Sequence, residues 1–249
     1  MRKIQILAKT ETAASPLDLF LGLGNGQVTK DGEGGIHIPE TLTGEVQTLD
    51  FASWLPFAAK EFKISPNATD YVLVPVIAII SDIPNRNGVA FPLSALKAWN
   101  RERGCIAYQT FKGQPVHIEH ASDDPTSAIG IIVDTTLRQL KGFGGGKIWK
   151  LMLLLAIDKT NPHPYVGKIL RGEINTYSMG AYVQAYTCGY CGAVAGQCRH
   201  IDLSRPKDLY ALNGKLVFRE VHGVSGYETS AVFDPAYVSA LSDTKLFLK

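Results

Sequence analysis

The chain has 249 residues, 45% of them hydrophobic, and a formal net charge of +2 at pH 7. This length and composition allow one principal globular domain with a sizeable core and exclude a chain that is disordered throughout. The small, scattered charge does not imply a nucleic-acid or membrane-surface partner. No apolar run approaches the roughly 20 residues that span a bilayer, and Arg2 and Lys3 precede only the short stretch 4–8, which is no signal peptide, so we expect a soluble protein that is not exported.

The first 65 residues form an N-terminal region, a candidate regulatory segment ahead of a main domain over 66–249. Its clearest predicted element is a helix over 50–62, where apolar side chains recur at helical spacing behind an Asp50 N-cap. These side chains are Phe51, Trp54, Leu55, Ala58 and Phe62. Pro56 either kinks this helix or marks its start.

The main domain is predicted to be rich in strands. It begins with a nearly continuous β-branched run over 71–80, typical of a strand buried on both faces. The elements expected next are a helix over 92–100, strands over 114–119, 128–137 and 148–157, a short helix over 164–171, strands over 174–183, 215–221 and 226–233, and a helix from about residue 235. Glycines at 142–146 lack the ending of a phosphate-binding loop and indicate a hairpin turn. Together these predict an α+β fold.

Two residues of this domain suit nucleophilic catalysis. Ser178 lies on a predicted strand with Gly180 two residues later, which lets a substrate approach the backbone closely. A serine needs a base to become a useful nucleophile, and His120 is the best candidate because it stands where a strand gives way to a polar loop. By itself, either residue fits a structural role better.

Five segments in a fixed order resemble the prohead proteases of tailed phages. They are Phe111–His120, Asp124–Gly130, Ala156–Asp158, Gly172–Gly180 and Glu228–Ala236, and the resemblance runs from about residue 70 to 240. It implies that His120 is the base and Ser178 the nucleophile of a serine endopeptidase. The family is similar in architecture to herpesvirus assembly proteases, which implies a partly closed antiparallel β-barrel surrounded by helices.

The acid that orients the histidine is left open between two residues. Glu228 fits the order of the family's Glu-x-Ser-x-Val-x-x-Pro-Ala ending, and Asp158, on the strand before the nucleophile, is the rival. Glu119 is close in sequence, but on a strand it should point away from His120. We favour Glu228 slightly, while a solvated or ion-paired carboxylate is an equal alternative for each.

A second constellation follows the nucleophile at about 186–202. Cys188 and Cys191 form a Cys-x-x-Cys pair, and Cys198 and His200 follow. Four such ligands close a tetrahedral zinc site with no open position, so a structural Zn²⁺ is expected there and no cofactor is expected for catalysis. A redox pair or unliganded thiols are the alternatives.

The resemblance implies a place and partners for this activity. The expected substrates are phage scaffold and major capsid precursor proteins, together with the protease itself, inside a prohead that assembles in the host cytoplasm. Self-association in the prohead core is expected as well. The alternatives are a non-enzymatic zinc-knuckle virion component that binds protein or nucleic acid, and an inactive structural protein with the same fold.

Overall fold

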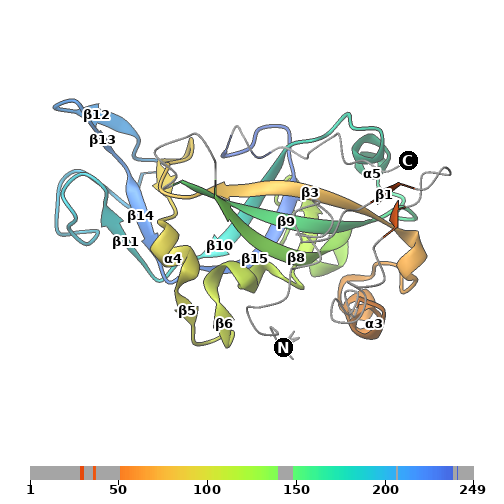
Figure 1. Cartoon of the computed structure of the whole chain (residues 1–249). Helices are drawn as coiled ribbons and strands as arrows, with labels where there is room; N and C mark the ends of the chain where they lie inside the picture. The colour runs from red at the N-terminus through yellow and green to blue at the C-terminus, as the bar shows by residue number, and fades with distance from the viewer. Residues whose placement is uncertain are drawn as a thin grey trace.

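A computed structural model describes residues 29–30, 36–37, 51–139, 148–205, 207–237 and 240 of the chain. The fold is mixed α+β, mostly strands with few helices, as predicted. A curled half-barrel sheet forms its centre, where β3, β9 and β8 lie side by side (Figure 1). Among the described residues, no helix is both long enough and apolar enough to cross a bilayer.

The central sheet has six strands in the order β10-β15-β7-β8-β9-β3. Their bounds are β3 Tyr71–Ile80, β7 Pro115–Ile118, β8 Gly130–Gln139, β9 Trp149–Asp158, β10 Tyr177–Tyr182 and β15 Ser225–Ala231. The two edge strands, β10 and β3, approach each other. No ladder pairs them in the part of the chain that the structure describes, so the sheet curls without closing.

The expected antiparallel barrel is wrong at one strand pair. β15 runs parallel to β7, with Ser230 opposite His117, whereas the other four neighbouring pairs are antiparallel. Parallel neighbours need a long crossover, and more than a hundred residues separate these two strands in the chain. This long-range pairing places the end of β7 next to β15, with β10 on the other side of β15.

Four smaller sheets and several short helices make up the rest of the described fold. β4 (Val89–Ala90), β11 (Ala185–Cys188) and β14 (Arg219–His222) form one sheet in the order β11-β14-β4, and β5 (Trp99–Asn100) pairs with β6 (Cys105–Ile106). β12 (Tyr210–Leu212) pairs with β13 (Lys215–Val217), and β1 (Thr29–Lys30) with β2 (Ile36–His37). The helices are α3 (Phe51–Phe62), α4 (Leu93–Lys97), α5 (Pro164–Leu170) and the 3-10 turns η1 (Ala68–Asp70), η2 (Ala107–Phe111) and η3 (Pro125–Ser127).

Most predicted elements occur, and the differences have local causes. Helix α3 contains Pro56 within it and does not start there. The helix expected over 92–100 ends at Lys97, because the chain turns at Ala98 into the short β5–β6 pair. The strand expected over 215–221 is two strands broken at Phe218.

Two of the predicted elements fall partly or wholly outside the described residues. The glycine turn at 142–146 is outside them, although β8 and β9 pair in antiparallel register up to Gln139 opposite Trp149. Residues 235–237 are not helical, and most of the helix expected after them also lies outside the described part.

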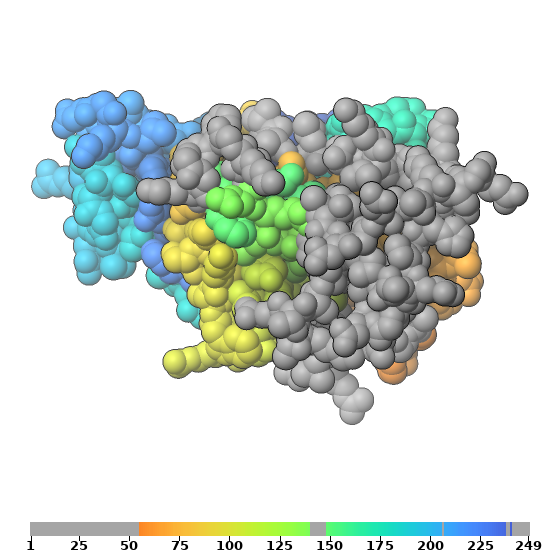
Figure 2. All heavy atoms as spheres, viewed as in Figure 1, coloured from red at the N-terminus to blue at the C-terminus, as the bar shows by residue number. Residues whose placement is uncertain are grey.

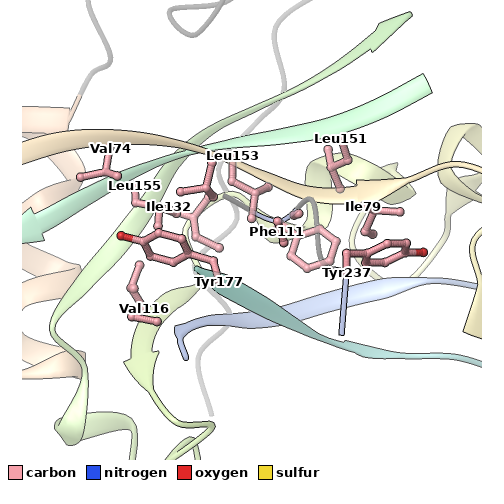
Figure 3. Packing of buried hydrophobic residues seen from close by; sticks show 14 of the residues in the cluster. Val74, Ile79, Phe111, Val116, Ile132, Leu151, Leu153, Leu155, Tyr177 and Tyr237 are labelled. Carbon is pink, nitrogen blue, oxygen red and sulfur yellow. The ribbon is translucent and has the colours of Figure 1, made fainter. Parts of the chain in front are cut away.

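Two clusters of buried side chains cover the two faces of the sheet. Figure 3 shows the larger one, in which Phe111, Leu153 and Tyr177 fill the space between the strands above and below them. On the other face Ala58 and Phe62 of α3 and Ile64 pack against β8 and β9. The last part of the N-terminal region therefore shares a core with the sheet.

We predict that Leu153→Ala lowers the free energy of unfolding by about 2–5 kcal/mol, because this central side chain is fully buried and its removal leaves a cavity. Leu216→Ala is the matched control, since Leu216 is 51% exposed and should change stability by only about 0.5 kcal/mol. Urea unfolding followed by circular dichroism measures both. Equal losses in the two variants would contradict the placement of β9 in the core.

Candidate active site

Ser178 stands on β10, the edge strand of the central sheet, and is 9% exposed. Its partner across the ladder is Ser230 of β15, and the next pair on the same face joins Gly180 to Glu228. Residues directly opposite one another in a ladder share a face of the sheet, as do residues two apart along a strand. These four residues therefore face the same side.

His120 reaches this face from a tight turn after β7. Glu119 and His120 have positive φ angles of 48° and 58°, a conformation that non-glycine residues adopt seldom and that often marks functional sites. This turn interrupts the alternation of side chains between the two faces of the sheet. The His120 imidazole Nδ1 lies 3.0 Å from Oε1 of Glu228. The His120 side chain is 48% exposed, whereas Glu228 is completely buried.

Ser230 connects the acid to the histidine turn. Its buried hydroxyl donates to Oε2 of Glu228 at 2.7 Å and accepts from the backbone N–H of His120 at 3.2 Å. Both carboxylate oxygens of Glu228 thus have a partner, which a buried carboxylate needs. Sequence reasoning gave Ser230 no role, although its position two residues after Glu228 on a strand places the two on one face.

The Glu228 contact sets the proton arrangement on His120. A carboxylate only accepts hydrogen bonds, so Nδ1 carries the proton and Nε2 of the neutral ring is the basic nitrogen. The hydrogen bond to Glu228, with the negative charges of Glu228 and Glu119, raises the pKa of His120 above its ordinary value of 6.5 against the opposite effect of partial burial.

Gly180 leaves room for this arrangement. A Cβ at residue 180 would lie 2.5 Å from Oε1 of Glu228 and 2.5 Å from the Tyr227 ring. Real Cβ atoms do not approach other atoms so closely, so a side chain here would push the acid away from His120. The glycine that the sequence suggested for substrate approach also makes space for the acid.

Ser178 and His120 both line one cavity of about 270 Å³. The backbone of β10 from Tyr177 to Ala181 runs along it, and one wall comes from the segment that includes Asn85 and Phe91. A base and a hydroxyl that border the same cavity can act on one bound molecule.

The rival acid, Asp158, has other partners. As the last residue of β9 it accepts hydrogen bonds from the backbone N–H of Ser65 and from the N–H and hydroxyl of Thr160, all at 2.7–2.8 Å. The carboxylate fastens the turn after β9 to the segment before β3. Of the two candidate acids, Glu228 is the one hydrogen-bonded to His120.

The other polar residues near His120 are engaged elsewhere. Glu119 accepts from the backbone N–H of Phe233. His117 is almost fully buried, its Nδ1 lies 3.1 Å from the Ser127 hydroxyl, and burial lowers its pKa.

The four predicted metal ligands are brought together. The ligand atoms of Cys188, Cys191, Cys198 and His200 all lie within 4.8 Å of one another, close enough to hold a metal ion. Three thiolates and an imidazole are a donor set that zinc favours. Backbone N–H groups of Ile201 and His200 lower the pKa of the Cys198 thiol, which favours the thiolate that a metal needs.

The lobe that carries these ligands is larger than the insertion expected at about 186–202. Val217, Leu212 and Ile201 pack around Cys188, and the Tyr210 hydroxyl donates to the carbonyl of His200. These contacts add the β12–β13 hairpin to the lobe, which stands out at one end of the molecule in Figures 1 and 2.

A buried ion pair anchors this lobe to the main domain. The Arg219 guanidinium donates from Nε and Nη2 to Oδ2 of Asp208 at 3.0 and 2.9 Å, and Nη2 also donates to the carbonyls of Asp202 and Arg205. β14, which carries Arg219, pairs with β4 of the main domain. The base of the lobe is therefore connected, through the β14–β4 pair, to residues that line the cavity.

We predict that Glu228→Gln lowers the pKa of His120, because the substitution removes the charge that raises it and leaves partial burial, which lowers it. NMR titration of the imidazole nitrogens measures this pKa, which should lie above 6.5 in the wild type. Asp158→Asn is the control and should leave it unchanged. A lowered His120 pKa in Asp158→Asn, with no change in Glu228→Gln, would instead make Asp158 the partner of His120.

Comparisons with protein-family models, with curated proteins and with solved structures found no match to this chain.

Proposed function

We propose that this protein is a serine endopeptidase in which Ser178 is the nucleophile, His120 the general base and Glu228 the acid that orients the base. The observation that carries the proposal is the 3.0 Å contact between His120 Nδ1 and the buried Glu228 carboxylate, beside a cavity that Ser178 also borders. This is the relation of base to acid that serine catalysis needs.

The proposed reaction uses each group in turn. His120 Nε2 takes the hydroxyl proton of Ser178 while the oxygen attacks a peptide carbonyl, and Glu228 stabilises the imidazolium that forms. The imidazolium then gives its proton to the leaving amine. Water, activated by the same base, hydrolyses the acyl-enzyme. Because the base must be neutral, kcat/KM should rise with pH through the raised pKa of His120.

The biological setting that we propose is the maturation of a tailed-phage prohead. The order of the five segments between about residues 70 and 240 supports it, since it resembles the prohead proteases. The substrates would then be scaffold and major capsid precursors and the protease itself, within the prohead interior.

We predict that wild-type protein cleaves its scaffold or capsid precursor and that Ser178→Ala reduces cleavage at least about a thousandfold, because no other group in the proposed mechanism replaces the attacking oxygen. His120→Ala should cause a loss of similar size. Gel and mass-spectrometric analysis of the digests measures both, and circular dichroism verifies that the variants fold.

The matched control for this experiment is Ser127→Ala, which removes a serine hydroxyl that contacts His117 and is not part of the proposed machinery. Cleavage that persists in folded Ser178→Ala would reject the nucleophile. A wild-type protein that cleaves none of these precursors while binding one of them would favour the non-enzymatic virion component.

The metal that we propose for the Cys/His cluster is a structural Zn²⁺. Four protein ligands would fill a tetrahedral shell and leave no position for a substrate, so the ion would supply folding energy to the lobe and no catalytic step.

We predict about one zinc per chain in protein purified under reducing conditions, measured by plasma mass spectrometry. Cys191→Ser should lose the metal and lower the melting temperature of the lobe, because the ligand shell is then incomplete. Cys105→Ser is the control, since Cys105 lies outside the cluster. Unchanged metal content and melting in Cys191→Ser would contradict the assignment.

A further inference from the structure

The cavity beside Ser178 has a distinctive chemistry. Of the described residues that line it, none is an aspartate, glutamate, lysine or arginine, and His120 is the only one that titrates near neutral pH. Apolar walls come from residues such as Val89, Phe91 and Val221. An ionised side chain that entered would lose part of its hydration and would meet no aspartate, glutamate, lysine or arginine among the described lining residues.

Asn85 is the most buried amide of this cavity, with 7% of its surface exposed. Its Oδ1 accepts from the backbone N–H groups of Asn87 and Val89 at 3.0 and 3.1 Å. Because an oxygen must occupy that position, these two bonds also fix the orientation of the amide.

The other half of the Asn85 amide is unpaired. Its Nδ2 donates to no described residue, and Asn85, with 7% of the residue exposed, borders the cavity. A donor that borders a cavity without a protein partner can bond water, or an acceptor on a ligand that displaces this water. The missing partner is a hydrogen-bond acceptor.

The segment that carries Asn85 is well held. The N–H of Asn85 donates to the carbonyl of Val89, and Ser81 and Phe91 at its two ends form a parallel bridge. β4 within the segment pairs with β14. The donor therefore has a fixed position, as selection between similar side chains requires.

We propose that this cavity receives the substrate side chain next to the scissile bond, that this side chain carries an amide, glutamine or asparagine, and that Asn85 selects it by donating from Nδ2 to its carbonyl oxygen. The inference rests on the proposed endopeptidase function and adds a substrate class to it.

An amide fits better than the other side-chain classes. A carboxylate offers acceptors but brings a charge that no described lysine or arginine of the lining neutralises, and an apolar side chain leaves Nδ2 without a partner. The cavity volume of about 270 Å³ equals roughly nine water molecules at about 30 Å³ each, enough for a glutamine side chain.

The experiment measures binding first, so that it does not depend on catalysis. Acetylated pentapeptides of four alanines followed by glutamine, methionine, glutamate or lysine resemble cleavage products and differ only in the last side chain. NMR titration of wild-type protein gives their dissociation constants. Glutamine and methionine have nearly the same shape, so their ratio isolates the hydrogen bond.

We predict that the glutamine peptide binds about fivefold to tenfold more tightly than the methionine peptide, the change expected for one net hydrogen bond, and that it also exceeds the glutamate and lysine peptides. Asn85→Asp keeps the oxygen that holds Asn87 and Val89 but replaces the donor by a negatively charged acceptor. This variant should lose the glutamine preference and bind the lysine peptide best.

Asn87→Asp is the matched control, because it introduces the same charge at an exposed position of the cavity, where water screens it. Its ranking of the peptides should stay close to that of the wild type. Equal binding of glutamine and methionine, or an Asn85→Asp variant that weakens all four peptides equally, would overturn the proposal. Equal weakening of all four peptides would indicate that Asn85 Nδ2 bonds the main chain of the substrate and not its side chain.

Cleavage of longer peptides with the same four residues before the scissile bond separates the two hypotheses. Glutamine preference in binding without any cleavage would reject the endopeptidase and keep the amide pocket. Cleavage without glutamine preference would keep the endopeptidase and reject the pocket assignment.

Discussion

The arrangement of the candidate site depends on one buried carboxylate. Glu228 has no exposed surface, so its charge requires donors on both oxygens, and His120 and Ser230 provide them. Ser230 also accepts from the His120 backbone, so the acid, the histidine turn and the strand that faces Ser178 are held by the same bonds. Gly180 leaves the space for this network. A substitution at Glu228, Ser230 or Gly180 would therefore alter the orientation of His120.

The curled sheet is what makes this network possible. β15 lies between β10 and β7. Ser178 lies on β10, and the turn that carries His120 follows the end of β7. The β15–β7 pair joins segments more than a hundred residues apart, and its parallel direction places Ser230 beside both His117 and Ser178. The core of Phe111, Leu153 and Tyr177 fixes the curvature from inside.

The metal-ligand lobe and the candidate site share structural elements. β11 carries Tyr186, which lines the cavity, and ends at Cys188 in the ligand cluster. β14 supplies Val221 to the cavity and Arg219 to the buried pair with Asp208. A metal that orders the cluster would therefore also steady one wall of the cavity, without contact with the reacting atoms.

The sequence by itself determined the elements and the local motifs. Periodicity located β3 and α3, and the close spacing of Cys188, Cys191, Cys198 and His200 indicated a common site, because neighbours in sequence can meet through local turns. It also singled out Ser178 and His120, but it left the acid open between Glu228 and Asp158 and gave no role to Ser230 or Asn85. Only the tertiary structure decided which carboxylate contacts His120 and which groups Ser230 and Asn85 bond. The parallel β15–β7 pair, the left-handed turn at His120 and the partners of each carboxylate arise from contacts between distant segments, which no local pattern encodes.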